Sequence, residues 1–109
     1  YSPDNYKNLL QRGQRLRGFF DVEAKEIRLE SLNREIEAPG FWNNPKTAEQ
    51  SLKIQASLKA SVDKYYRIKS NLEDLQVLAD LEAPQEELNE MYDNVARQIE
   101  DEELKSMLS

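Results

Sequence analysis

Pro39-Gly40-Phe41-Trp42-Asn43-Asn44-Pro45 is the stretch around which the rest of the chain is organised. It holds two of the four prolines, one of the three glycines and the single tryptophan. A proline disfavours helical geometry in the residue before it, so a helix that approaches this stretch should stop at Ala38. Gly40 permits a tight turn, and Pro45 suits the first turn of a new helix with an asparagine cap before it. The stretch therefore predicts a reversal of the chain between two helices.

Two interpretations exist for the aromatic surface that Phe41 and Trp42 bring to this corner. The corner either locks two helices together or offers a patch to a partner. Truncating a buried tryptophan to alanine costs about 3–5 kcal/mol, which is the scale of a packing anchor. We therefore predict a structural corner made of Pro39, Phe41, Trp42 and Pro45, with Phe41 or Trp42 buried between the helices.

Helical periodicity dominates the sequence after the corner. No glycine or proline occurs from about Lys46 to Leu81. Apolar side chains recur there at steps of three and four residues, which is the spacing of one helix face: Ile54, Leu58, Tyr65, Ile68, Leu72, Leu75 and Ala79. Residues 46–81 therefore predict one long central helix of roughly 50 Å, at 1.5 Å per residue. A break at Glu82-Ala83-Pro84 should precede a last helix.

The residues before the corner carry two further helical stripes, one over residues 3–20 and one over residues 22–37. Gly13 lies on the first stripe, where it allows close approach of another helix. Gly18 costs roughly 0.8–1 kcal/mol relative to alanine inside a helix, and Asp21 is suited to cap a second helix. The two stripes form either one continuous helix or two helices with a kink near residues 18–21. The predicted fold is all-α, an antiparallel helical hairpin or coiled-coil-like bundle of three to four helices.

Composition excludes several classes of function. The chain of 109 residues contains neither cysteine nor histidine, which excludes disulfides, thiolate or imidazole metal sites, and cysteine or histidine catalysis. No run approaches the roughly 18 apolar residues that a membrane span needs. We expect a cytoplasmic protein without a membrane segment, a cofactor or a small-molecule substrate. Because the chain starts at Tyr1, we also expect it to be a piece of a longer protein.

Charge is distributed unevenly along the chain, whose net charge is −6. Residues 1–20 and 45–70 are basic, whereas residues 71–109 hold twelve acidic and two basic side chains. The basic segments either pack against the acidic one inside the fold or form a phosphate-binding face, and the first interpretation is the commoner. Arg12, Arg15 and Arg17 are the candidate contacts for a partner.

The abundant carboxylates do not predict an active site. Asp101, Glu102 and Glu103 are adjacent, so they point around a helix instead of converging. A general acid and base pair needs a cleft and a raised pKa, which an exposed run of acids does not provide. We therefore expect no enzymatic activity, catalytic residue, metal site or cofactor in this chain.

Several motifs resemble the release factor 2 family of bacterial class I translation termination factors. The resemblance covers roughly residues 6–109. It is carried by these segments: Leu16-Arg17-Gly18-Phe19-Phe20-Asp21-Val22-Glu23-Ala24-Lys25, Arg28-Leu29-Glu30, Asn33, Glu35, Pro39, Phe41-Trp42-Asn43, Pro45, Leu72-Glu73-Asp74 and Met107-Leu108-Ser109. The connection around residues 80–86 is shorter than in comparable family members.

The resemblance implies a whole factor that recognises UGA and UAA and triggers hydrolysis of peptidyl-tRNA. The family reads codons with a Ser-Pro-Phe motif and promotes hydrolysis with a Gly-Gly-Gln motif, and neither string occurs in residues 1–109. The chain then corresponds to the helical N-terminal domain, residues 1–109. The implied partners are the ribosome, near the base of its stalk, and the class II GTPase release factor. The resemblance also implies that Gly18 is retained for a programmed frameshift site in the message.

A second hypothesis comes from a different class of protein. A free-standing helical coiled-coil adaptor or assembly chaperone would show the same helical pattern without the remaining domains. A reading frame that continues past Ser109 to a Gly-Gly-Gln motif favours the release factor, and a stop codon there favours the adaptor. Under either hypothesis the exposed stripe of a coiled coil favours self-association of the isolated chain.

Overall fold

A computed structural model of the chain describes residues 1–108. Within these residues the structure is almost entirely helical, and no strand occurs. The elements are α1 (Pro3–Phe19), α2 (Val22–Glu37), the 3₁₀ helix η1 (Phe41–Asn43), α3 (Pro45–Asp80) and α4 (Gln85–Leu108). The all-α fold predicted from the sequence is confirmed. Ser109, the last residue of the family resemblance, lies outside the described residues.

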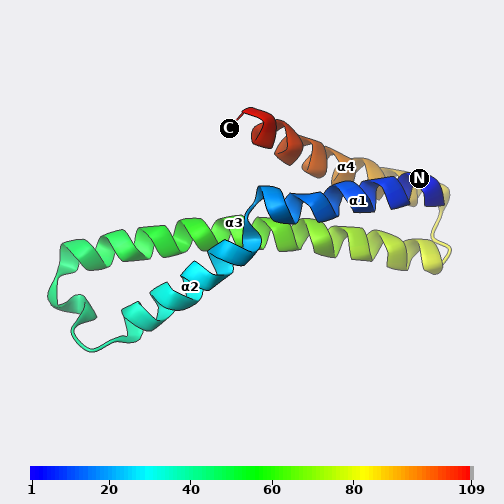
Figure 1. The fold of residues 1–109 in the computed structure, drawn as a ribbon. Helices are drawn as coiled ribbons and strands as arrows, with labels where there is room; N and C mark the ends of the chain where they lie inside the picture. Colours follow the sequence, from blue (N-terminus) through cyan, green and yellow to red (C-terminus); the bar gives the residue numbers. More distant parts are fainter. Residues whose placement is uncertain (109) are drawn as a thin grey trace.

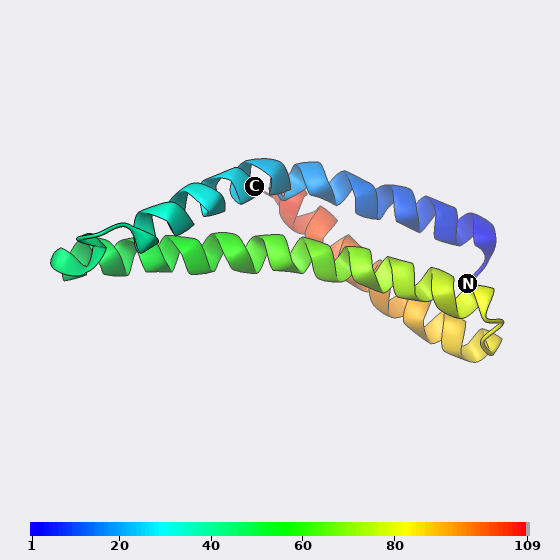
Figure 2. The same ribbon diagram turned by 90° about the horizontal axis from the view of Figure 1, so that it is seen from below.

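The long helix α3 is the axis of the molecule, and α1, α2 and α4 all run antiparallel to it (Figure 1). α2 lies along the N-terminal half of α3, whereas α1 and α4 flank its C-terminal half (Figure 2). The molecule measures 57 × 31 × 18 Å along its principal axes. α3 contains 36 residues, so the predicted central helix is confirmed to within one residue at each end.

The apolar core forms where α1, α3 and α4 meet, and it continues under the start of α2. Its buried members are the apolar residues of the predicted stripes: Tyr6, Leu9, Leu16, Val22, Val62, Tyr65, Ile68, Leu72, Leu75, Leu88, Val95 and Ile99. The Tyr6 hydroxyl donates a hydrogen bond of 2.9 Å to the carbonyl oxygen of Leu72, which satisfies the polar end of a buried ring. This burial raises the pKa of Tyr6.

Gly13 lies at the closest approach of α1 to the other helices. A Cβ atom built on Gly13 would lie 2.5 Å from Leu72 Cδ1 and 3.5 Å from Ile99 Cδ1. Packed carbon atoms do not approach to 2.5 Å, so α1 can pack this closely against α3 because Gly13 has no side chain. The predicted role of Gly13 is confirmed. At Gly18, by contrast, a Cβ atom would meet nothing within 4 Å.

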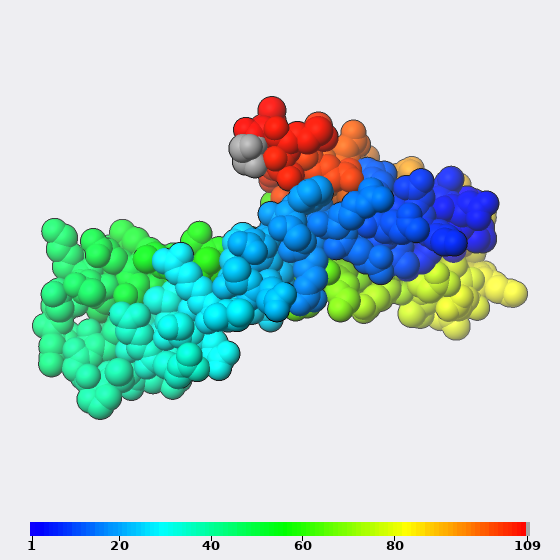
Figure 3. Space-filling view, viewed as in Figure 1, coloured from blue at the N-terminus to red at the C-terminus, as the bar shows by residue number. Residues whose placement is uncertain are grey.

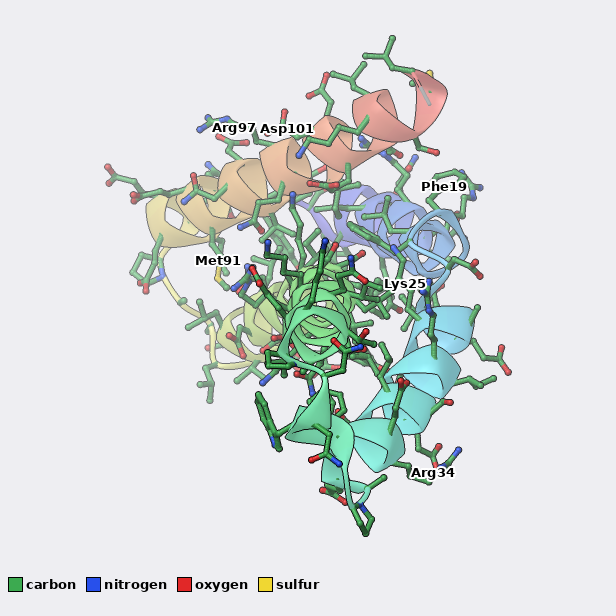
Figure 4. The ribbon with its side chains drawn as sticks, turned by 90° about the vertical axis from the view of Figure 1, so that its left-hand side faces the viewer. Phe19, Lys25, Arg34, Met91, Arg97 and Asp101 are labelled. Carbon is green, nitrogen blue, oxygen red and sulfur yellow. The ribbon has the colours of Figure 1, made fainter. Side chains whose placement is uncertain are left out.

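The first two helices are separated by a kink at Asp21. The backbone of Asp21 adopts the left-handed conformation (φ 52°, ψ 46°), which ends α1 and redirects the chain into α2. Aspartate tolerates this conformation better than most residues do. Asp21 occupies the cap position, but its side chain makes no capping hydrogen bond, so the predicted side-chain cap is wrong. Lys25 Nζ donates a hydrogen bond of 2.6 Å to Ser61 Oγ and so ties α2 to α3 below the kink (Figure 4).

The corner between α2 and α3 reverses the chain as predicted. α2 ends at Glu37, and Gly40 has a positive φ of 84° that a residue with a side chain adopts only with strain. The Asn44 side chain accepts a hydrogen bond of 3.3 Å from the Thr47 backbone N–H and so caps α3, which begins at Pro45.

The predicted burial of Phe41 or Trp42 between the helices is wrong. Trp42 is 64% exposed, and Phe41 is only half-buried. The physical reason lies in the first turns of α3, where Ala48 and Ser51 are the buried residues. Their small side chains let α2 and α3 approach closely, which leaves no room for an indole ring between them. Trp42 therefore lies outside the contact between α2 and α3. α2 and the N-terminal half of α3 form an arm that extends beyond α1 and α4 (Figure 3).

Candidate functional site

The three candidate arginines of α1 differ in what they contact. Arg12 faces α4, where its Nε donates a hydrogen bond of 3.1 Å to Glu103 Oε2 and its Nη2 donates one of 2.7 Å to Oε1. A two-point bond of this kind has the fixed geometry that favours arginine over lysine. The hydrogen bonds to Glu103 raise the pKa of the Arg12 guanidinium. Arg12 therefore joins α1 to α4, and its charge is matched inside the fold.

Arg15 and Arg17 are exposed, and neither forms an ion pair within residues 1–108. Both line a hollow on the surface at the kink, together with Gln14 and the acidic side chains of Asp21 and Glu23, with which neither arginine forms an ion pair. Gln14 also lines a second hollow with Lys69 of α3, so the three cations lie around one polar side chain. We call Arg15, Arg17 and Lys69 the basic face.

Tyr66 adds an aromatic ring next to the basic face. Lys69 Nζ lies 5.9 Å from the centroid of the Tyr66 ring, within the range of a cation–π contact. The Tyr66 hydroxyl donates a hydrogen bond of 2.9 Å to Glu26 Oε1. That bond raises the pKa of Tyr66, and the nearby charge of Arg17 opposes the increase. The hydrogen bond to Glu26 therefore ties the ring to α2, beside Lys69.

Glu102 is the residue whose role sequence reasoning missed. It was expected in an exposed run of acids, but it is only 8% exposed, so that expectation is wrong. Lys64 Nζ lies 2.6 Å and Lys105 Nζ 3.2 Å from Glu102 Oε1. Burial by itself raises the pKa of the Glu102 carboxyl, but the hydrogen bonds from the two lysines outweigh it and lower that pKa. The group is therefore a charged anchor between α4 and α3.

The adjacent side chains of Glu102 and Glu103 thus form ion pairs with two different helices, α3 and α1. The interpretation that the basic segments pack against the acidic one is confirmed at Arg12 and at Lys64. A signal for Glu102 was present in the sequence: Val95 and Ile99 continue the buried stripe of α4, and the next step of three residues reaches position 102.

Within residues 1–108, no group of three or more acidic side chains is placed to hold a metal ion. None of the helices in the same part of the chain is long and apolar enough to cross a membrane.

A second candidate surface lies at the end of the α2–α3 arm. Trp42 and the outer side of the first turns of α3 enclose an open groove of about 340 Å³. The groove is lined by Trp42, Pro45, Glu49, Leu52, Lys53 and Ala56. We call it the tip groove. It is separate from the basic face, which lies at the kink between α1 and α2.

Comparison with known proteins identifies the class of protein to which this fold belongs. Residues 25–109 match the model of the PCRF domain, so the chain belongs to the PCRF domain family. The chain is 38% identical over 94 residues to "Peptide chain release factor 2" of Shewanella baltica (strain OS223). That match covers 86% of this chain and 26% of the relative, so the chain spans about a quarter of the relative's length. The resemblance expected from the sequence is confirmed.

Proposed function

We propose that the chain is the ribosome-docking and regulatory region of a stop-codon release factor that acts in translation termination. The observation that carries this proposal is the match of residues 25–109 to the PCRF domain. The similarity to a protein named as peptide chain release factor 2 supports a factor that responds to UGA and UAA. The helical adaptor remains the competing hypothesis, and no structural feature favours it.

We further propose that residues 1–109 form one helical N-terminal domain of such a factor. The shared core of α1, α3 and α4 supports a single unit. Codon reading and peptidyl-tRNA hydrolysis then belong to parts of the factor beyond this chain, because neither Ser-Pro-Phe nor Gly-Gly-Gln occurs in its sequence. The domain's role is to help place the factor near the stalk base in the cytoplasm and to respond to the class II GTPase release factor.

The basic face is the surface that we assign to ribosome contact. Ribosomal RNA is a polyanion, and unpaired surface cations both steer and stabilise binding to such a partner. Arg15 and Arg17 retain free charges, whereas the charge of Arg12 is matched by Glu103. We therefore narrow the candidate arginines to Arg15 and Arg17, and we add Lys69.

A charge-reversal experiment tests this assignment. We expect the double variant Arg15→Glu and Arg17→Glu to bind ribosomes at least ~10-fold more weakly in a sedimentation assay, with a reduced dependence on salt. The matched control is Arg28→Glu with Arg97→Glu, which changes the net charge equally at exposed positions of α2 and α4. Arg97 is labelled in Figure 4. An equal loss in both variants would indicate a non-specific effect of net charge and would contradict the assignment.

A further inference from the structure

Trp42 is a large aromatic side chain that the fold does not use. The indole is 64% exposed, and η1, which carries it, contributes no buried residue. Its one aromatic contact among the described residues is with the neighbouring Phe41 ring, which it meets edge-on at a centroid distance of 5.0 Å, a geometry that favours this orientation. Tryptophan is among the residue types most enriched at the energetic centres of protein interfaces.

The tip groove has the shape that receives a helix. Its apolar lining on α3 comes from Pro45, Leu52 and Ala56, which are seven and four residues apart. That spacing forms one straight stripe on a helix, and a second helix packs against such a stripe by inserting its own side chains. From position 45 to position 56 the stripe is roughly 17 Å long, about three helical turns.

The rest of the fold leaves this stripe uncovered. α1 and α4 flank the other half of α3, and the arm extends beyond both of them (Figure 3). α2 packs on the side of α3 from which Gln55 Nε2 donates a hydrogen bond of 2.6 Å to Asn33 Oδ1. The tip groove opens on a different side of the same turns, between Trp42 and α3.

The charges around the groove select the kind of occupant. Glu49 and Lys53 are its charged lining residues, and they pair with each other at 3.0 Å. The rim therefore carries no net charge, so it offers no attraction to a phosphate backbone. Because Glu49 and Lys53 already pair with each other, a partner helix gains its binding from an apolar face, and it needs only polar flanks beside this pair.

We propose that the tip groove docks an amphipathic helix of a partner protein. The partner helix is about three turns long, places its apolar stripe over Leu52 and Ala56, and packs its edge against the Trp42 indole. The groove is remote from the basic face, and the proposal therefore holds or fails independently of the proposed function.

The chain's single tryptophan makes a direct binding assay possible. The probe is a 14-residue peptide without aromatic residues, with leucines along one helical face, lysine and glutamate on the flanks, and alanine elsewhere. Its control has the same composition with the leucines distributed around the helix. We expect the first peptide to shift the Trp42 emission to shorter wavelength, because the indole leaves water, and to bind at least ~10-fold more tightly than the control peptide.

Two variants locate the binding to the groove. Ala56→Lys and Leu52→Lys place a charge on the stripe, and each should weaken peptide binding at least ~10-fold. Ala56 is exposed, so its substitution retains the fold, which circular dichroism verifies. The matched control is Ile27→Lys on α2, where an exposed apolar side chain lies outside the groove. That variant should bind the peptide as the unmodified chain does.

Four outcomes would overturn the proposal. They are the absence of peptide binding at millimolar concentration, equal binding of the control peptide, and unchanged binding by Ala56→Lys. The fourth is an emission shift that appears in the absence of the peptide. If concentrating the chain causes this shift, the groove binds a second copy of the chain. If an RNA oligonucleotide causes it, the groove binds nucleic acid.

Discussion

Lys64 Nζ and Glu102 Oε1 lie 2.6 Å apart, although Lys64 belongs to the middle of α3 and Glu102 to the last turns of α4. The next residue, Glu103, bonds Arg12 of α1 at 2.7 Å. Two successive carboxylates of α4 therefore hold two different neighbouring helices. They do so beyond Ile99, the last buried apolar residue of α4, where apolar packing ends.

The first prediction concerns the stability that Glu102 supplies. Glu102→Gln should lower the free energy of unfolding at pH 7 by about 1–2 kcal/mol, because it removes the charge that two lysines bond in a largely buried place. The pKa of Glu102 is lowered in the folded state, so its contribution is present above the unfolded pKa of about 4.3 and is lost as the pH falls through the lower, folded value.

Urea denaturation at a series of pH values measures this effect. The difference between the unmodified chain and Glu102→Gln should be constant near neutral pH and should disappear at the acidic end. Glu100→Gln is the control, because Glu100 is exposed on the same helix. A difference that persists after full protonation would mean that Glu102 acts through packing instead of charge.

The second prediction applies one substitution to two glycines of α1. Gly18→Ala should raise the free energy of unfolding by about 0.5–1 kcal/mol, because alanine favours helix and its Cβ meets nothing within 4 Å. Gly13→Ala should lower it by about 1 kcal/mol, because its Cβ would overlap the buried end of Leu72. Thermal or urea unfolding of both variants checks the opposite signs. Stabilisation by Gly13→Ala would show that Leu72 moves aside without cost.

The third prediction concerns the kink. Asp21→Val should lower the free energy of unfolding by about 1–2 kcal/mol, because a β-branched residue resists the left-handed backbone at this position. Asp21→Asn should change it by less than about 0.5 kcal/mol, because asparagine tolerates the conformation and no side-chain cap is lost. Urea unfolding of the two variants at pH 7 makes the comparison. Equal stabilities would indicate that the kink relaxes into a continuous helix.

The helices were predictable because their signals are local. Ser2 accepts a hydrogen bond from the Asn5 backbone N–H, as a serine before Pro3 should, and the corner has the proline and glycine that its geometry requires. The apolar stripes identified the core, since one residue in three or four must face inward in an amphipathic helix. These features depend on residues within a few positions of one another.

The candidate site was less predictable because it depends on distances between helices. Whether Trp42 is buried depends on how closely α2 and α3 approach. The small residues Ala48 and Ser51, which lie in other turns of the chain than Trp42, determine that distance. The pairing of Arg12 with Glu103 joins residues 91 positions apart, so composition suggested the attraction without identifying the partners. The packing of the helices therefore determines which arginines have an ionic partner and which do not.

The uninterrupted length of α3 has a mechanical consequence. Its 36 residues span both halves of the molecule, with α2 bracing one half and α1 and α4 bracing the other (Figure 1). A helix under load at one end moves as a stiff beam when its hydrogen-bonded turns are continuous. A displacement of the arm is therefore transmitted along α3 to the turns that pack against α1 and α4 in the core. The same continuous helix carries both the exposed Trp42 end and the buried core, so the two ends of the molecule are mechanically coupled.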